Sequence, residues 1–412
     1  MRSEVSKMNV NIRTKDILNK FSLSRQTLYN WIREGKLNAP KKDWRGWRMW
    51  TEQHLLELEN IIEMNEQKNQ TPLNPDAKLQ IHNRRYLGSK YKLLPFIWKV
   101  VSENCKDIKV VADIFGGTGV VADFFNKKGK TVIVNDILYS NYLSYLTWFS
   151  DEKIDYEKIE YLIAHFNQVQ PREDNYVSAH FGGTYFTVEN ARKIGFIREE
   201  IEKIGDSLSF REKAILITSL LYAMDKVANT TGHYDAFRRK LDTTKEIKLL
   251  VPEFKDEINK GNRIYNEDAN KLVRNITADL VYIDTPYNSR QYSDAYHLLE
   301  NIAEWKKPEV VGVAKKMVNR SHIKSDYCTM KAPQAFADLI SNIDSKYILV
   351  SYNNMAQKGV GRSNAKISSE EIIDTLSSRG RVSIFETDFT PYTTGKSKID
   401  NHKEILYLCE LS

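Results

Sequence analysis

Residues 108–136 read IKVVADIFGGTGVVADFFNKKGKTVIVND, and this stretch decides the fold. The apolar run 108–113 predicts a buried strand, residues 120–128 predict a helix that ends at Gly129, and residues 131–134 predict a second strand. A strand, a helix and a second strand form a βαβ unit, whose two strands lie parallel in one sheet. The glycine-rich turn before the helix stands where doubly wound sheets bind nucleotides, so we expect an α/β fold with a ligand site at this turn.

The glycine turn by itself leaves two classes of nucleotide cofactor open. Gly117, Gly119 and Ala122 satisfy the dinucleotide-binding spacing, and Asp136 stands about 20 residues further on. A nicotinamide-dependent dehydrogenase is therefore an alternative on this segment, and Asp136 would bind ribose hydroxyls in either class. The chain shows no constellation of His or Lys residues typical of hydride transfer, which argues against the dehydrogenase.

A second decisive motif, Asp284-Thr285-Pro286-Tyr287, follows the apolar run 278–283, which predicts another buried strand. An acceptor, a Pro and an aromatic ring then stand at the carboxyl end of a strand. Such a group can hold an exocyclic amine and stack on the planar ring that carries it. The alternative is a strand followed by a Pro-stiffened turn.

Several motifs in a fixed order resemble one enzyme family. The 284–287 motif is a close variant of the Asp-Pro-Pro-Tyr loop of amino-methyltransferases, and residues 115–119 resemble the Phe-x-Gly-x-Gly motif of S-adenosyl-L-methionine (SAM) enzymes. Residues 85–90 resemble a further SAM-binding motif. Taken together, residues 84–410 resemble the Dam-like N6-adenine DNA methyltransferases. The resemblance implies a Rossmann-like SAM-dependent methyltransferase sheet with a helical target-recognition insert at about 140–260.

The resemblance also implies which residues bind the cofactor. We expect SAM contacts at Tyr86, Ser89, Lys90, Asp113, Phe115, Gly117, Thr118, Gly119, Asn135, Asp136, Asp268 and Ala269. Asp268 would contact the adenine amine of SAM, and the alternative is that it caps a helix beginning at Ala269. No metal site is predicted, because the three cysteines and eight histidines are dispersed along the chain.

The same resemblance assigns the chemistry to residues 284–287. The Asp284 carboxylate and the Thr285 carbonyl would accept the two N6 hydrogens of an adenine, held in place by the stiff Pro286. Tyr287 would stack on the base, which has to be flipped out of the duplex first. Thr285 departs from the family, which usually has Pro there. Since every residue carries a carbonyl, we expect the chemistry to be kept.

Positive charge is concentrated at the N-terminus. The net charge is +7, yet residues 1–50 contain 12 Lys/Arg and 4 Asp/Glu, a balance of +8 that leaves −1 for the remainder. Such asymmetry favours a polyanion-binding module.

The N-terminal stretch also has the pattern of a DNA-binding unit. It predicts two short helices, a basic and aromatic hairpin and a longer helix, at residues 13–20, 25–34, 45–50 and 52–65, with Ser24 and Gly35 capping the second helix. The pattern resembles the MerR-type winged helix-turn-helix, whose second helix lies in the major groove. It implies DNA contacts by Arg25, Gln26, Thr27, Arg45 and Arg48. A small helical protein-interaction module is the alternative.

The expected organisation is a MerR-like domain at residues 1–67, a linker at 68–82 and a methyltransferase domain at 83–412. Further DNA contacts are expected near the catalytic loop, at His233, Tyr234, Arg290, Gln291 and Tyr292.

The expected function is site-specific N6-methylation of adenine in duplex DNA, with a cognate restriction endonuclease as a further partner. The alternatives are an RNA adenine N6-methyltransferase and a DNA-binding regulator with an inactive methyltransferase domain. The chain has no run of 18 apolar residues and no signal-peptide stretch at residues 1–11, so we expect a cytoplasmic protein without a membrane partner. We expect a monomer and leave a dimer open.

Overall fold

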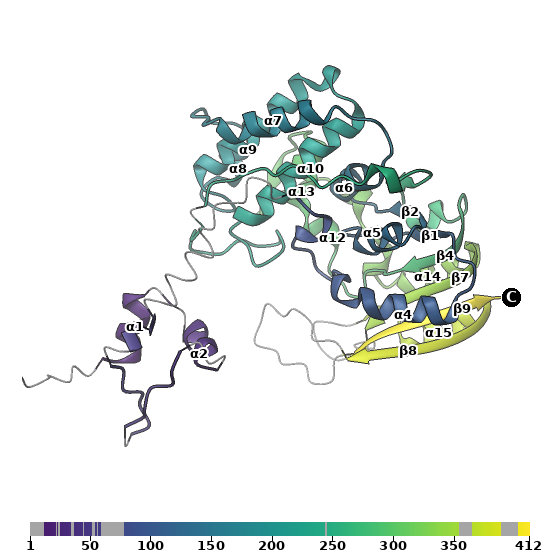
Figure 1. The fold of residues 1–412 in the computed structure, drawn as a ribbon, viewed down its shortest axis with the longest axis horizontal. Coiled ribbons are helices and arrows are strands. Elements are labelled where there is room, and N and C mark those ends of the chain that lie inside the picture. The colour runs from purple at the N-terminus through teal and green to yellow at the C-terminus, as the bar shows by residue number, and fades with distance from the viewer. Residues whose placement is uncertain are drawn as a thin grey trace, which may run out of the picture. The chain divides into compact units, whose positions relative to one another are not determined.

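The structure is a computed structural model. It describes residues 12–21, 23, 25–33, 37–43, 45–51, 54–55, 57–58, 78–243, 245–353, 365–388 and 403–412. The chain divides into two compact units, residues 1–77 and 78–412, and each is described by itself (Figure 1).

The smaller unit contains helices α1 (Thr14–Lys20) and α2 (Arg25–Arg33) and a hairpin in which Lys42 pairs with Arg48. Its core gathers apolar side chains from these elements and from residues outside them: Ile17, Leu28, Leu37, Trp50 and Leu58. Both predicted helices and the predicted hairpin are therefore confirmed as elements. The predicted caps Ser24 and Gly35, and most of the predicted helix 52–65, lie outside the described residues.

The larger unit is built on a mixed sheet with the strand order β3-β2-β1-β4-β7-β9-β8 among the described residues. The strands are β1 (Val110–Asp113), β2 (Thr131–Asn135), β3 (Arg263–Tyr265), β4 (Thr277–Ile283), β7 (Asp344–Asn353), β8 (Gly380–Asp388) and β9 (Lys403–Leu411). β1 lies parallel to β2 and β4, β2 to β3, and β4 to β7, whereas β9 runs antiparallel to β7 and β8. The expected α/β fold with a Rossmann-like, mostly parallel sheet is confirmed.

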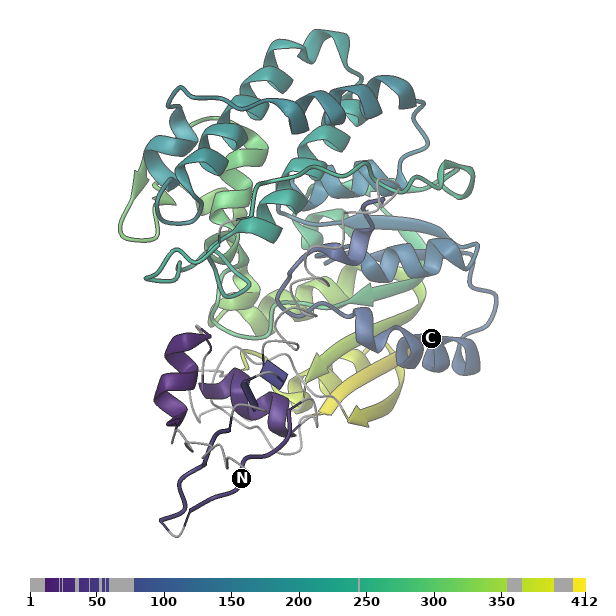
Figure 2. The same ribbon diagram turned by 60° about the vertical axis from the view of Figure 1, so that its left-hand side comes forward.

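Helices cover both faces of this sheet (Figures 1 and 2). On one face lie α4 (Leu94–Asn104), α5 (Val120–Lys127) and α6 (Tyr139–Phe149), and on the other lie α11 (Ala269–Leu272), α14 (Ala332–Asn342) and α15 (Ser369–Ser377). Val111 packs in the core formed with α4, α5 and α6, and its neighbour Ala112 packs in the core formed with α11, α14 and α15. Successive strand residues point to opposite faces, so a continuous apolar run suits a strand that is covered on both.

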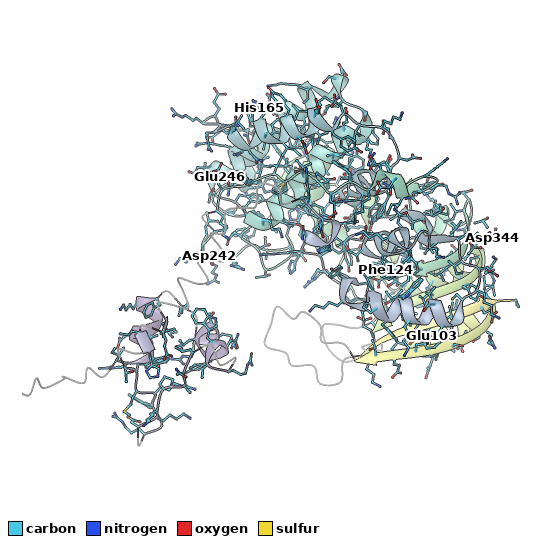
Figure 3. The ribbon with its side chains drawn as sticks, viewed as in Figure 1. Glu103, Phe124, His165, Asp242, Glu246 and Asp344 are labelled. Carbon is cyan, nitrogen blue, oxygen red and sulfur yellow. The ribbon has the colours of Figure 1, made fainter. Side chains whose placement is uncertain are left out.

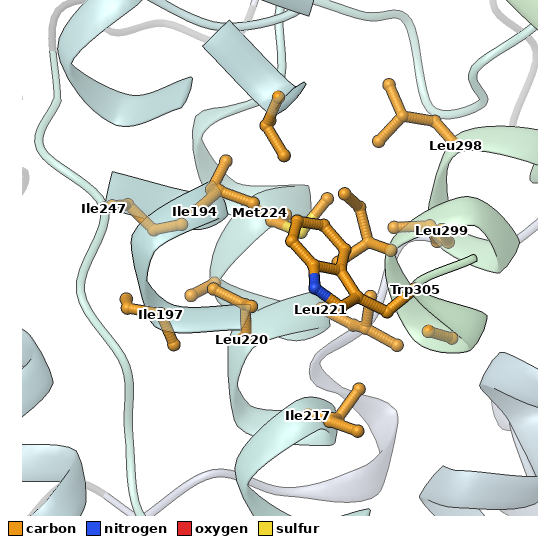
Figure 4. Packing of buried hydrophobic residues seen from close by; sticks show 14 of the residues in the cluster. Ile194, Ile197, Ile217, Leu220, Leu221, Met224, Ile247, Leu298, Leu299 and Trp305 are labelled. Atoms are coloured by element: carbon orange, nitrogen blue, oxygen red, sulfur yellow. The ribbon is translucent and has the colours of Figure 1, made fainter. Parts of the chain in front are cut away.

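A helical lobe interrupts the sheet between β2 and β3. It contains α7 (Tyr156–Gln168), α8 (Tyr176–Phe181), α9 (Val188–Lys203) and α10 (Phe210–Val227), and His165 of α7 and Glu246 mark its surface (Figure 3). Its core also takes up α13 (His297–Glu304) and Trp305, which lies among Leu220, Leu221 and Met224 (Figure 4). The lobe thus draws on residues after the 284–287 motif as well as on the predicted insert.

Residues 78–82, which the sequence places in the linker, are built into the larger unit. The Leu79 amide donates to the Val251 carbonyl (2.7 Å), and the Glu253 amide donates to the Leu79 carbonyl (2.8 Å). Leu79 and Ile81 are buried in the core beside α4 and α5. Within the described part of the chain, no helix is long and apolar enough to cross a membrane.

Candidate active site

The strand order reverses between β1 and β4, since β1 leads to β2 and β3 while β4 leads the other way to β7. Doubly wound sheets bind ligands at such a point, beyond the carboxyl ends of the strands. A cavity of about 900 Å³, including the space that opens to solvent, lies there. Its lining contains most of the predicted site residues: Tyr86, Ser89, Lys90, Asp113, Phe115, Gly117, Thr118, Asn135, Asp136, Asp268, Ala269, Asp284, Pro286, Gln291 and Tyr292.

The glycine turn after β1 forms one wall of the cavity. Gly117 and Gly119 adopt positive φ angles of 53° and 79°, a conformation that favours glycine. A Cβ atom at Gly117 would lie 3.1 Å from Cε1 of Tyr86, so a side chain there would push into the ring. The Tyr145 hydroxyl donates to the Gly117 carbonyl at 2.8 Å and fixes the turn from behind. Gly119 completes the turn but does not line the cavity.

Asp136, at the end of β2, is held by three protein donors. Its Oδ2 accepts from the Gly117 amide (3.0 Å) and from Asn141 Nδ2 (3.0 Å), and its Oδ1 accepts from the Leu138 amide (2.8 Å). Burial raises the pKa of Asp136, and the hydrogen bonds from Leu138, Asn141 and Gly117 oppose that rise. Asp136 therefore ties the glycine turn to α6 while it lines the cavity.

Two residues that sequence reasoning missed, Arg84 and Asn141, complete this network. Asn141 accepts from Arg84 Nη1 at 2.7 Å and donates to the Tyr86 hydroxyl at 3.1 Å. The Arg84 guanidinium lies 3.5 Å from Asp225, and its carbon lies 5.3 Å from the centre of the Tyr86 ring. Arg84 directly precedes the 85–90 motif, and this position was a signal in the sequence. Asn141 has no comparable signal.

Aromatic rings form the wall beside Tyr86. The Tyr86 and Tyr296 rings are stacked at 4.5 Å with an interplanar angle of 1°, and the Tyr292 ring lies 5.6 Å from Tyr86. The Tyr296 hydroxyl accepts a hydrogen bond from the Leu87 amide at 2.7 Å. Tyr292 donates to the Leu87 carbonyl at 3.2 Å. Tyr292 is therefore part of the cavity wall and holds the 85–90 motif in place.

Another part of the cavity wall comes from the segment that follows β3. Asp268 accepts from the Lys271 amide at 3.2 Å and caps α11, and it also lines the cavity. The capping role that the sequence left as an alternative is thus present together with a position at the candidate site. Asn135 donates to the Glu267 carbonyl at 3.0 Å and accepts from the Glu267 amide at 2.9 Å. Glu267 lines the cavity as well, although the sequence analysis did not single it out.

The Asp284 carboxylate, just beyond β4, forms an ion pair with Lys90 in the cavity wall. Lys90 Nζ lies 3.0 Å from Asp284 Oδ1. Burial raises the pKa of Asp284 to about 6, Lys90 opposes that rise, and Glu404 adds to it. Burial alone would lower the pKa of Lys90, but Asp284 and Glu404 raise it above its usual value. Lys90 therefore stays protonated, and Asp284 is ionised at neutral pH beside a fixed counter-charge.

Asp113, at the end of β1, is a second buried carboxyl group in the cavity wall. Its Oδ1 has no hydrogen-bond partner among the described residues. Burial and the neighbouring Asp284 raise the pKa of Asp113 to about 8, so this group is largely neutral at pH 7. A buried carboxyl oxygen without a partner in the wall of a cavity favours a donor group on a bound ligand.

The rest of the 284–287 motif is divided between the cavity and the core. Pro286 lines the cavity, whereas Thr285 is buried beside it. The Tyr287 ring is half-buried and meets the edge of the Tyr352 ring, with centres 6.2 Å apart at 75°. The Lys366 amide donates to the Tyr287 carbonyl at 3.0 Å, which fixes the end of the loop.

The residues predicted to contact DNA near the loop have different surroundings. Tyr234 is buried, and its hydroxyl donates to Asp225 at 2.7 Å, so the structure gives it a place in the core in contrast to the sequence-based assignment. Gln291 Nε2 donates to the Ser325 carbonyl, and its Oε1 accepts from the Ser325 amide, both at 2.9 Å. Gln291 therefore fixes the Ser325 backbone within the cavity wall.

His233 and Arg290 lie together around one carboxylate. Arg290 Nε lies 3.7 Å and His233 Nδ1 3.9 Å from Asp235, which also binds Lys316 at 2.8 Å. About half of the Arg290 side chain is exposed. Among the described residues, no group of His, Cys, Asp and Glu could hold a metal ion.

The predicted contacts in the smaller unit lie on α2 and the hairpin. Arg25, Gln26 and Arg45 are exposed, and Thr27 is half-buried. The Arg48 guanidinium lies over the Tyr29 ring at 4.4 Å, which joins the hairpin to α2.

Comparison with known proteins gives this fold and site a family. Residues 86–359 match the D12 class N6 adenine-specific DNA methyltransferases. The matched residues make up more than half of the chain, which therefore belongs to this family of enzymes. The expected class of methyltransferase is thus confirmed.

Individual relatives agree with the family. The chain is 37% identical over 342 residues to the modification methylase StsI of Streptococcus sanguinis, which covers 79% of this chain and 51% of that protein. It is 32% identical over 331 residues to the type II methyltransferase M.NlaIII of Neisseria lactamica, covering 77% of this chain and 95% of that one. The chain thus spans about half the length of StsI and nearly all of M.NlaIII.

Among solved structures, a magnesium protoporphyrin IX methyltransferase from Synechocystis PCC 6803 with bound SAM is similar at 9% identity and a TM-score of 0.27. The similarity covers 85% of this chain and 96% of that one.

Proposed function

We propose that this chain is a site-specific DNA adenine N6-methyltransferase, which transfers a methyl group from SAM to the N6 amine of a flipped-out adenine and protects host DNA in a restriction–modification system. One observation supports this above the others. In a chain of the D12 class, an ionised Asp284 is held by Lys90 at 3.0 Å on the wall of a cavity at the switch point of the sheet. An acceptor at that place suits an amine substrate.

The cavity fits SAM as the cofactor, which supplies a methyl group already activated on a sulfonium centre. It lies beyond the carboxyl ends of the strands at the switch point of the sheet, where doubly wound sheets bind nucleotide ligands. The glycine turn at Gly117 lets a ligand approach the backbone, and the partnerless Asp113 Oδ1 can accept from a ligand donor. The residues that would hold SAM are those of the cavity wall: Tyr86, Ser89, Lys90, Asp113, Phe115, Gly117, Thr118, Asn135, Asp136, Asp268 and Ala269, with Gly119 shaping the turn.

The chain's own residues would act on the amine by position and electrostatics. Adenine N6 is a poor nucleophile because its lone pair is delocalised into the ring. Asp284 and the Thr285 carbonyl would accept its two hydrogens, which makes the nitrogen more tetrahedral and directs its lone pair at the methyl group. Tyr287 would stack on the base, a contact that typically contributes about 1–3 kcal/mol. Side chains often change rotamer on binding, and the ring edge that now meets Tyr352 would have to turn.

DNA would be bound by two surfaces. Around the catalytic loop, the half-exposed Arg290 and its neighbour His233 are the contacts that the structure supports best. The smaller unit would act as a MerR-like winged helix-turn-helix, with α2 in the major groove through Arg25, Gln26 and Thr27 and with Arg45 and Arg48 on the wing. Protection footprints of the full chain and of a chain lacking residues 1–70 test this role. Identical footprints and identical site choice would remove it.

The central test is incubation with tritiated SAM and a mixture of DNA sequences, followed by nucleoside analysis and sequencing for modified sites. We expect N6-methyladenine at one defined sequence. A parallel incubation with RNA separates the RNA-modifying alternative, and label in RNA alone would refute the proposal. The Asp284→Ala variant should lose methylation while it still binds SAM, and full activity in that variant would remove the assigned mechanism.

The remaining expectations concern the cellular setting. We propose a cytoplasmic monomer that acts beside a cognate restriction endonuclease without having to bind it. Survival of host DNA against a co-expressed endonuclease, compared with the Asp284→Ala variant, measures protection directly. Sedimentation of the purified chain measures its oligomeric state.

A further inference from the structure

Glu404 is brought to the candidate site by the antiparallel strand β9. Its backbone pairs with Asn353 of β7 and with Thr387 of β8. The last pair between β4 and β7 joins Ile283 to Val350. Asn353 lies further along β7 in the same direction, so Glu404 stands beyond the carboxyl end of β4, at the level of the 284–287 loop.

The face on which Glu404 lies follows from the alternation of β9. Leu406 and Leu408 pack in the core beneath α4, whereas Ile405 and Tyr407 pack in the core on the other side. Because strand side chains alternate, Glu404 shares the face of Leu406. Lys90 directly precedes the short 3₁₀ helix Tyr91–Leu93 that runs into α4, and it therefore lies on that face too.

The Glu404 carboxyl group is buried without a complete set of partners. The residue is 6% exposed, and its Oε2 has no hydrogen-bond partner among the described residues. Its charge acts on Lys90 and Asp284, since it raises the pKa of both groups. Buried carboxylates without a partner are rare in folded proteins, and one beside a reacting centre calls for a functional reason.

The functional reason for the buried Glu404 is electrostatic. Lys90 and Asp284 alone form a neutral pair, and Asp113 is largely uncharged at pH 7 because its pKa is raised to about 8. A neutral pair does little for the positive charge that develops on adenine N6 during transfer. A second carboxylate whose charge acts on Lys90 gives the group a net negative charge and leaves Asp284 free to act on the amine.

We propose that Glu404 is a positioning residue that acts through Lys90: it offsets the positive charge of the lysine ammonium, so that Lys90 does not cancel the field of the ionised Asp284 at the substrate amine. The inference rests on the proposed function, which it deepens by adding a third member to the Lys90–Asp284 pair. The other titratable groups that face this cluster are Tyr282, Tyr287, Tyr292 and Asp113.

The test compares Glu404→Gln, which removes the charge and keeps the shape, with Glu410→Gln on the same strand. Glu410 is exposed and pairs with Arg381 at 2.6 Å, so it serves as a matched control. We expect the Glu404→Gln variant to lower single-turnover methylation about tenfold. We also expect it to lower the affinity for SAM more than that for S-adenosylhomocysteine, which lacks the sulfonium charge. Glu404 raises the pKa of Asp284. Removing its charge in Glu404→Gln should therefore move the acidic limb of the variant's pH–rate profile to lower pH.

The Glu404→Asp variant keeps the charge and should restore the affinity ratio and the pH limb. Two results would overturn the inference: a Glu404→Gln variant that behaves like wild type, and one that loses activity with an unchanged limb and affinity ratio, as a merely structural residue would. A wild-type chain that produces no N6-methyladenine would refute the proposed function instead. The affinity ratio of the variants is measured by calorimetry and still reports on Glu404 in that case.

Discussion

Lys90 Nζ lies 3.0 Å from Asp284 Oδ1, and this ion pair joins the loop before α4 to the end of β4. The two residues belong to motifs that lie far apart in the sequence, and the sequence analysis gave them different tasks. In the structure the two are linked, because Lys90, expected to bind the cofactor, pairs with Asp284, the carboxylate expected to bind the substrate. The proposed cofactor and substrate sites therefore share one electrostatic group.

Replacing Lys90 by Met should remove the charge that holds Asp284. Lys90 opposes the burial-driven rise in the pKa of Asp284, so without it that pKa rises further and the acidic limb of activity moves to higher pH. We expect kcat at neutral pH to fall about 10²-fold, as for the loss of one preorganised electrostatic group. Lys92→Met is the control, because Lys92 is exposed on the same segment. An active Lys90→Met variant with an unmoved limb would contradict the role of the pair.

The wild-type enzyme should lose activity as acid protonates Asp284. The chemistry needs the carboxylate, whose pKa is raised to about 6, so the active form is present above that pH and is lost below it. Single-turnover rates should fall about tenfold for each pH unit below pH 6. SAM binding, measured in parallel, separates this effect from loss of the cofactor. A rate that stays flat down to pH 5 would exclude Asp284 as the titrating group.

Gly117→Ala should weaken SAM binding. Gly117 has φ of 53°, and a Cβ there would lie 3.1 Å from the Tyr86 ring in the cavity wall. Gly129→Ala is a matched control, since Gly129 has φ of 75° and no described atom would lie within 4 Å of its Cβ. Both changes strain the backbone at a cost of about 1–2 kcal/mol. Only Gly117→Ala should also raise the Kd for SAM. Equal Kd values for the two variants would count against a role of the glycine turn in SAM binding.

Asn141→Ala should lower both SAM affinity and stability. Asn141 contacts Arg84, Tyr86 and Asp136 at 2.7, 3.1 and 3.0 Å, and its loss leaves buried polar groups without partners. Each such group costs about 1–3 kcal/mol. Urea unfolding measures the stability change, and titration with SAM measures the affinity. Asn104→Ala on α4 is the control, because that amide makes a surface contact with the Val100 carbonyl of its own helix. Wild-type SAM affinity in Asn141→Ala would show that the network is not needed for the cofactor.

Local patterns predicted the parts of the site that lie within short stretches of chain. The strand β1, the glycine turn and helix α5 follow from apolar runs and glycines that act within a few residues. The predicted strand at 278–283 is confirmed as β4, with Asp284 directly after it, for the same reason. Both kinds of prediction depend on contacts between neighbours in sequence.

Other features did not follow from local patterns. Tyr234 reads as an exposed aromatic in a polar loop, but it is buried against Asp225 because helix α10 and the loop after it fold together. The edge strand β8 alternates weakly and was not predicted. Glu404 lies near the start of β9, which pairs with β7 and β8, and no spacing in the chain connects it to Lys90.

The sequence by itself determined the βαβ unit, the glycine turn and the order of the methyltransferase motifs, because backbone sterics and apolar periodicity act over short distances along the chain. The tertiary structure decided which polar and charged groups meet: Lys90 pairs with Asp284, Arg84 donates to Asn141, and Glu404 lies at the level of the 284–287 loop. These contacts depend on strand order and register, which are set by long-range packing of the whole sheet. No local sequence pattern predicts them.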